Sequence, residues 1–213
     1  DEYDRFMRSG LEGPYFEVLF QLLGVKVWIA SESDTFNGND ATATGSDKPL
    51  YKTNIQNSKA VLLFDGTSDF MSVSNTSLTS GLTGMTVFLV VKQPTLGVNK
   101  TYLSKWDYAT DGTYAIQTGA ASSDQLTMYV ANACNSSGSE NQNSTDANLT
   151  TDFFVLAFVY DGSQSTNADR VKVYRNGTLL STFTNGTIGT SLTSCSATLK
   201  IGSFGGTLAT LRL

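Results

Sequence analysis

The chain has 213 residues, of which 15 % are charged, and its formal net charge is −5. This length suits one β-sandwich domain and is sufficient to bury a sizeable core. The low charge, together with many Ser, Thr, Asn and Gly residues, is typical of extracellular or virion β proteins. Basic residues do not cluster, so we expect no nucleic-acid partner.

Histidine is absent from the sequence. Its absence excludes Ser-His and Cys-His nucleophile pairs, histidine-ligated zinc and any imidazole-based pH switch. Much of enzyme chemistry is therefore excluded by one missing residue type.

Residues 1–24 differ in composition from the rest of the chain. A charged stretch, DEYDRFMRSGLEGP, precedes a mostly apolar run that is interrupted by Glu17, Gln21 and Lys26. This run is too short and too polar to span a bilayer. No signal-peptide pattern opens the sequence, which predicts a mature or internal fragment. Two interpretations remain: a strand or short helix that covers one edge of the sandwich, or an anchor that docks the domain on a larger assembly.

Gly24 separates this segment from a predicted strand at 25–31, in which we expect Trp28 to be buried. The composition of residues 33–48 predicts a loop. Further along, 61–64 and 70–73 flank an Asp-Gly turn and are predicted to pair as a hairpin.

The run at 85–94 is apolar at both odd and even positions, which predicts a central strand covered on each face. Pro94 ends it, since proline cannot donate a ladder hydrogen bond. Further strands are expected at 101–106, 112–119 and 124–133. The long polar stretch at 135–151 is predicted to be a loop.

Residues 153–205 carry the strongest strand signals. An apolar run ends in Asp161-Gly162, and Asn176-Gly177 then separates two β-branched, apolar runs. Such an Asn-Gly pair predicts a two-residue hairpin with both central residues at positive φ. A further strand runs to a glycine cluster, and 207–213 is expected to be the last strand.

About twelve short strands and no clear helix are predicted in all. This pattern indicates an all-β protein with two antiparallel sheets packed face to face, as a sandwich or jelly roll.

Several motifs resemble a known family. They are NGNDAT, PLY, LLFDGTSDFMSV, GMTVFLVVK, FFVLAFVYDGS, VKVYRNG and LKIGS. Together they look like the laminin-G-like domains of the concanavalin A-like lectin/glucanase superfamily, bacterial and phage type. The resemblance covers residues 25–213 and implies a jelly roll on a secreted, cell-surface or virion protein that binds glycans or protein partners, or builds an assembly. Two segments at the sandwich ends are shorter than in that family: only SESDTF precedes the Gly-Asn-Gly turn, and only GG precedes the last strand.

Glucanases of this superfamily carry a Glu-x-Asp-x-x-Glu strand that supplies nucleophile and acid. This motif is absent, and the glutamates lie at the N-terminus or in predicted loops: Glu2, Glu12, Glu17, Glu32 and Glu140. We therefore expect no enzymatic activity.

Two pairs of aspartates bracket predicted turns: Asp65 with Asp69, and Asp107 with Asp111. Either pair could give oxygen ligands to Ca²⁺, which binds carboxylates and carbonyls on flexible loops. Alternatively, these aspartates form the turns by accepting hydrogen bonds from their own backbone. No other cofactor is expected.

Trp106, Tyr108 and Tyr114 are candidates for an aromatic platform that binds a sugar ring. Aromatic residues near strand ends also serve as core or rim packing, and this alternative stays open.

Cys134 and Cys195 could form a disulfide, or both could remain free thiols. A bond between them would close a loop of about sixty residues and contribute roughly 4 kcal/mol in the chain-entropy model. Seven Asn-x-Ser/Thr sequons are present, some of which fall in predicted turns.

The leading functional hypothesis is a non-enzymatic structural and recognition module on a virus or phage particle, as a capsid-surface, fibre or tail component. Its partners would be copies of itself, other structural subunits and host glycans. The alternative is a lectin-like domain of a secreted or cell-surface bacterial adhesin.

Overall fold

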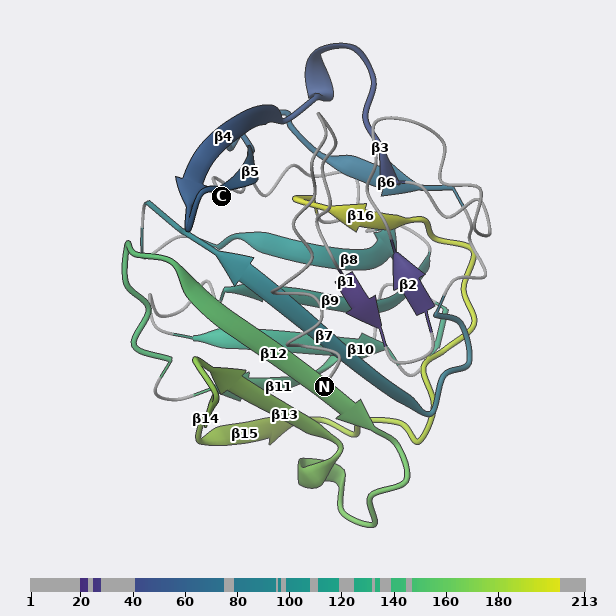
Figure 1. The fold of residues 1–213 in the computed structure, drawn as a ribbon. Coiled ribbons are helices and arrows are strands. Elements are labelled where there is room, and N and C mark those ends of the chain that lie inside the picture. The colour runs from purple at the N-terminus through teal and green to yellow at the C-terminus, as the bar shows by residue number, and fades with distance from the viewer. Residues whose placement is uncertain are drawn as a thin grey trace.

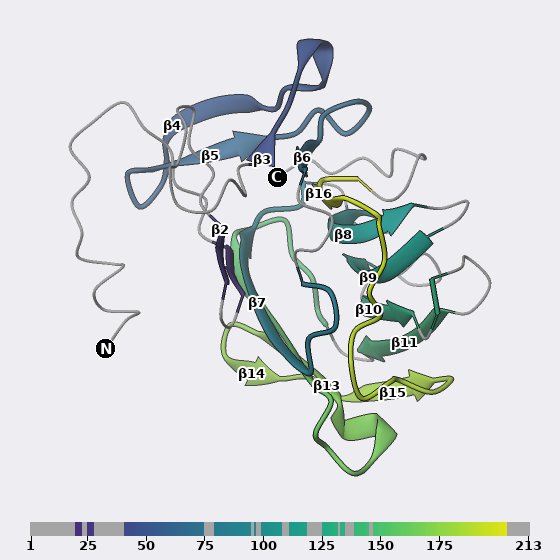
Figure 2. The same cartoon turned by 90° about the vertical axis from the view of Figure 1, so that its right-hand side faces the viewer.

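The computed structural model describes residues 20–22, 25–27, 41–74, 79–94, 96, 99–107, 111–118, 125–131, 133–134, 139–144 and 147–203. Within these residues two large antiparallel sheets face each other, and the side view in Figure 2 separates the two layers. The predicted all-β sandwich is therefore confirmed. The helical elements of the described residues are two 3₁₀ turns, η1 (Gly45–Asp47) and η2 (Asn167–Asp169).

The larger sheet has eight strands. In spatial order they are β15 (Thr182–Asn185), β11 (Ser139–Ser144), β10 (Leu126–Ala131), β9 (Asp111–Thr118), β8 (Thr101–Asp107), β16 (Leu199–Ile201), β6 (Met71–Val73) and β3 (Ala41–Thr42). Strands distant in sequence are neighbours here, because β16 lies between β8 and β6 (Figure 1). Long connections of this kind are characteristic of jelly rolls.

The smaller sheet has four strands. They are β14 (Thr178–Leu179), β13 (Val171–Arg175), β12 (Phe154–Asp161) and β7 (Gly84–Val91). A hairpin of β1 (Phe20–Leu22) and β2 (Val25–Val27) lies alongside β7, and its pairing crosses the predicted boundary after residue 24. A separate hairpin, β4 (Leu50–Gln56) with β5 (Lys59–Leu63), lies at one end of the sandwich (Figures 1 and 2).

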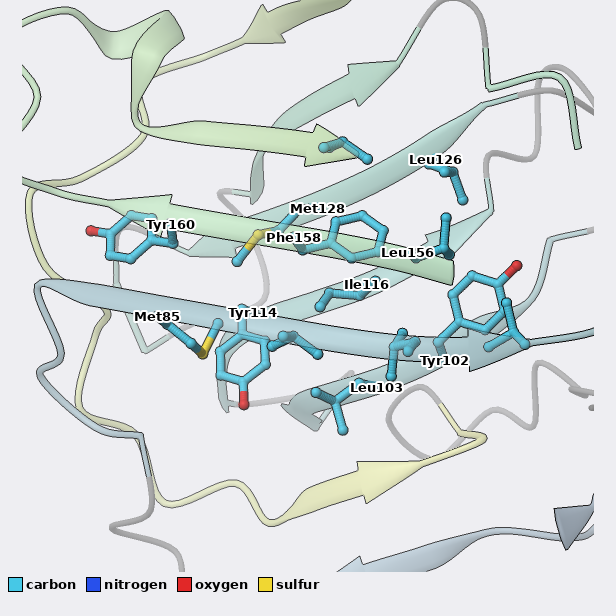
Figure 3. Packing of buried hydrophobic residues seen from close by; sticks show 14 of the residues in the cluster. Met85, Tyr102, Leu103, Tyr114, Ile116, Leu126, Met128, Leu156, Phe158 and Tyr160 are labelled. Carbon is cyan, nitrogen blue, oxygen red and sulfur yellow. The ribbon is translucent and has the colours of Figure 1, made fainter. Parts of the chain in front are cut away.

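Alternation along β7 and β12 builds one half of the core. Phe158 pairs with Val87 and Tyr160 with Met85, and all four side chains are buried between the sheets. The eight-stranded sheet supplies the opposing side chains, and Figure 3 shows both sets interdigitating around Met128. Burial of a large apolar side chain contributes about 1.5–3 kcal/mol, so this interior stabilises the facing of the two sheets.

The Asn176-Gly177 turn is formed as predicted. It connects β13 to β14, with φ of 48° at Asn176 and 81° at Gly177. Asn176 also accepts a hydrogen bond through Oδ1 from the Val155 N–H, at 2.9 Å. The turn is thereby fixed to the neighbouring strand β12.

The hairpin predicted around Asp65-Gly66 is wrong. Residues 59–63 pair with β4, and β6 pairs with β16 and β3. The Asp-Gly segment is a crossing from the end hairpin to the larger sheet, because the partners of both flanking strands come from elsewhere in the chain.

Two further predictions need correction. β7 was expected to be a central strand covered on both faces, yet it ends the four-stranded ladder, and Phe88 and Val90 are exposed. The polar stretch at 135–151 was expected to be a loop, yet β11 lies within it. Backbone pairing on both sides gives β11 a ladder that its composition does not predict. Trp28 and the strand predicted at 207–213 lie outside the described residues.

Among the described residues, no helix has the length and apolar character required to cross a bilayer.

Candidate functional site

The outer face of the larger sheet, near its β15 edge, combines aromatic and amide residues. Phe183 of β15 pairs with Asn143 of β11, and the next row joins Asn185, Asn141 and Tyr129 of β10. These two neighbouring rows place two aromatic residues and three asparagine positions on the adjacent strands β15, β11 and β10. We name Phe183, Asn185 and Tyr129, with Asn141 and Asn143 between them in register, the β15-edge surface.

The aromatic residues of this surface are accessible to different degrees. Phe183 retains 45 % of its exposure, whereas Tyr129 is half-buried against Trp106, Ala115 and Ala131. Asn185 is exposed beside Phe183. An exposed ring next to an exposed amide can cover an apolar sugar face while the amide donates and accepts hydrogen bonds.

Polar groups continue inward along the Phe183 row. Thr127 pairs with Gln117, and Gln117 pairs with Thr101 of β8; all three are buried. The Thr101 hydroxyl donates to Gln117 Oε1 at 3.3 Å. Buried polar side chains require partners, and this hydrogen bond supplies one for Thr101 and Gln117, at the end of the row far from Phe183.

The structure does not form the predicted aromatic platform from Trp106 and Tyr114. Tyr114 is fully buried on the core side of β9, and Trp106 is buried on the opposite side of the sheet. Their rings therefore cannot stack together on a solvent-exposed sugar, and they serve as packing. Tyr108 lies outside the described residues. Trp106 nevertheless supports Tyr129, and through it the β15-edge surface.

No family model matches the sequence, and no curated protein matches it either. Solved structures do match. Botulinum neurotoxin type C, whose cell entry is dependent upon interaction with two ganglioside molecules, aligns at 13 % identity and a TM-score of 0.53 over 93 % of this chain. Mouse laminin alpha1 chain, domains LG4-5, aligns at 12 % identity and a TM-score of 0.49 over 70 % of this chain. This chain covers 43 % and 37 % of those two chains, respectively, which is less than half of each.

The fold is a concanavalin A-like jelly roll. At this identity the likeness concerns the fold alone, and it confirms the architecture that the sequence motifs implied.

One connection of the jelly roll is fixed by a disulfide between Cys134 and Cys195, whose Cα atoms lie 5.6 Å apart. Of the two alternatives left by the sequence, the bonded one is therefore observed. The bond joins the segment after β10 to the chain that leads into β16. The adjacent Thr193 hydroxyl donates to the Ala131 carbonyl at 2.6 Å, which ties the same two segments a second time.

A buried lysine fixes this connection on the core side. Lys105 of β8 is fully buried, and its Nζ donates to the Cys195 carbonyl at 2.6 Å. It also contacts the Ser80 hydroxyl at 3.4 Å. Hydrogen bonds of this type reduce the free-energy cost of burying an ammonium group.

The Asp65–Asp69 pair has the geometry of a turn. Asp65 Oδ1 accepts hydrogen bonds from the backbone N–H groups of Thr67, Ser68 and Asp69 at 2.8–3.0 Å. Its Oδ2 accepts from the side-chain hydroxyls of Thr67 and Ser68. Asp69 Oδ2 in turn accepts from the Asp65 N–H at 2.7 Å. These bonds use the lone pairs that a cation would need, which favours the turn-forming alternative over a Ca²⁺ site.

The two carboxyl groups differ electrostatically. The hydrogen bonds to Asp65 outweigh its partial desolvation and hold its pKa well below the usual range. Desolvation raises the pKa of Asp69, and the nearby charges of Asp65 and Asp47 add to that effect. Across the described part of the chain, no three His, Cys, Asp or Glu side chains gather as a metal site would require.

Sequence reasoning missed the β15-edge surface. The alternation Thr-Phe-Thr-Asn at 182–185 was a signal for a half-exposed strand. The opposing strand β11, SENQNS, contains no apolar residue, so period-2 alternation could not reveal it.

Proposed function

We propose that this jelly roll is a non-enzymatic recognition module that binds glycans through the β15-edge surface. The observation that carries the proposal is the exposed Phe183 ring on β15, which has the exposed Asn185 two residues along the same face and the half-buried Tyr129 two strands away on that face. Carbohydrates present apolar ring faces bordered by hydroxyls, and an aromatic face flanked by amides complements both. The interaction of botulinum neurotoxin type C with gangliosides during cell entry is consistent with this class of ligand.

A surface or secreted setting forms part of the proposal. A disulfide persists in oxidising compartments and on virions, and Cys134–Cys195 fits that environment. We favour the surface of a virus or phage particle, where the domain would contact copies of itself or other structural subunits. The alternative is a lectin-like domain of a secreted or cell-surface bacterial adhesin.

The core geometry supports binding rather than catalysis. The interior between the two sheets is filled by apolar side chains, and aspartates such as Asp65 and Asp161 accept hydrogen bonds within their own turns. Neither aspartate is therefore arranged as a paired acid and nucleophile across a substrate.

A glycan array followed by calorimetric titration of the best-bound oligosaccharide tests the proposal. We expect Phe183→Ala to weaken binding about tenfold, since a ring contact contributes on the order of 1 kcal/mol beyond its buried area. Phe88→Ala is the matched control, because Phe88 is similarly exposed, at 48 %, but lies on the other sheet. The ligand should be recovered chemically unchanged.

An array without any bound glycan, or equal losses in the two phenylalanine variants, would overturn the assignment of this surface. Recovery of cleaved oligosaccharide would contradict the non-enzymatic part. Light scattering tests the assembly part separately, because a chain that stays monomeric at high concentration argues for the adhesin alternative.

A further inference from the structure

The outer face of the four-stranded sheet is apolar and exposed. Val90 retains 62 % of its exposure and Val155 retains 40 %, and the two are directly paired across β7 and β12. Phe88 lies two residues from Val90 on the same face and pairs with Ala157. These side chains are contiguous by register, and Leu179 of β14 is also exposed at the far edge.

Where one face of an antiparallel sheet is in contact with water, the residues on that face are normally polar. Here the outward-facing positions of β7 and β12 include the apolar residues Phe88, Val90 and Val155, and all three side chains are exposed. Contiguous apolar side chains of this kind on a folded domain mark a surface that binds something.

We propose that residues 1–19 of the same chain bind over this face. The first described strand, β1, begins at Phe20 and lies alongside β7, at the edge of the apolar face (Figure 1). Nineteen residues can span about 60 Å when extended, whereas four strands are about 20 Å wide. The segment therefore starts beside the face and is long enough to cross it.

The composition of the segment suits this surface. Next to β1 it carries Tyr15, Phe16, Val18 and Leu19, which can bury against the exposed valines. Its five carboxylates and two arginines give residues 1–19 a net charge of −3.

The sheet presents the opposite charge nearby. Lys172 pairs with Val159 on the outer face, and Lys92 follows β7 with its Nζ 5.6 Å from the centre of the Phe153 ring. Apolar contact with charge of opposite sign at the border is the usual arrangement of a binding surface.

Hydrogen exchange of residues 11–19, measured by mass spectrometry on the full chain, tests the proposal. We expect exchange at least tenfold slower than in a free peptide of the same sequence. The double variant Phe88→Ser, Val90→Asp should restore nearly the free-peptide rate. Both side chains are exposed, so the fold should tolerate their replacement.

Leu50→Ser is the control, because Leu50 is exposed at 58 % on the separate β4–β5 hairpin. Free-peptide exchange in the unaltered chain would overturn the proposal, as would protection that depends on Leu50. Protection that disappears on dilution, with dimers detected by light scattering, would assign the face to a second copy instead and overturn it as well.

Discussion

Gly112 lies directly against the indole ring of Trp106. A Cβ atom built at position 112 would come within 2.5 Å of Trp106 Cδ2, which is closer than real Cβ atoms approach a ring carbon. The two residues are paired across β8 and β9, so neither can move away without disturbing the ladder. Gly112 thus allows Trp106 to lie flat on the outer face of the sheet, where it supports Tyr129.

We predict that Gly112→Ala lowers the free energy of unfolding by about 1–3 kcal/mol, because the added methyl overpacks a buried ring. Chemical denaturation would measure the change. Gly84→Ala is the matched control, since its Cβ would have its nearest neighbour at 3.8 Å. Equal effects of the two substitutions would contradict the role given to the Trp106 contact.

Gly162→Ala should be at least as destabilising as Gly112→Ala. Its Cβ would lie 1.9 Å from the Thr190 carbonyl oxygen, which is backbone and cannot swing aside. The surrounding chain is also fixed, because the Gly162 N–H donates to the Thr83 carbonyl at 2.7 Å. Thermal melting of the variant would measure the loss of stability. An unchanged midpoint would contradict the prediction, because it would show that the segment 186–198, which contains Thr190, can shift to accommodate the methyl group.

Replacing both cysteines by serine should reduce the free energy of unfolding by about 4 kcal/mol, because the disulfide closes a loop of 61 residues in the unfolded chain. Urea denaturation of the double variant, compared with the oxidised parent, measures the difference. Reduction of the parent with dithiothreitol should have the same effect. Identical midpoints with and without reductant would argue against the bond.

Asp65→Asn should destabilise the protein at pH 7 by about 1 kcal/mol, since an amide presents one acceptor oxygen to donors that two carboxylate oxygens now share. The pKa of Asp65 is lower in the folded chain than in the unfolded chain, so its stabilising contribution is present above the unfolded value, near 3.8, and falls as pH drops below it. Denaturation at pH 7 and pH 3 should therefore show a smaller difference from the parent at the acid pH. A constant difference would contradict this linkage.

Added Ca²⁺ should leave the melting temperature unchanged, because the Asp65 oxygens are already occupied by internal donors. Calorimetry in millimolar CaCl₂ against a chelator provides the comparison. A rise of several degrees in the melting temperature that Asp69→Asn abolishes would instead show that Asp65 and Asp69 bind Ca²⁺.

Much of the fold could be predicted because its strongest signals are local. Asn176-Gly177 formed the expected turn, since positive φ at two successive residues is a property of those residues alone. The runs that became β7, β8, β9 and β12 were likewise recognised from alternation and β-branched or aromatic content.

Pairing partners could not be predicted in the same way. Asp65-Gly66 looked like a hairpin turn, but the strands on either side of it pair with other segments. Trp106, Tyr108 and Tyr114 looked like a platform, but the pleat puts Trp106 and Tyr114 on opposite faces of the sheet. The exposed Phe183 was not singled out, because its neighbours on β11 are 40 residues away in sequence.

By itself, the amino-acid sequence determined the all-β class, the Asn176-Gly177 turn and the lack of histidine chemistry, since each depends on residue type and short-range spacing. Only the tertiary structure decided which strands became neighbours, that Cys134 meets Cys195, and which aromatic rings reach solvent. The physical reason is that burial and cross-strand contact arise from segments far apart along the chain, and local pattern contains no information on the register that brings them together.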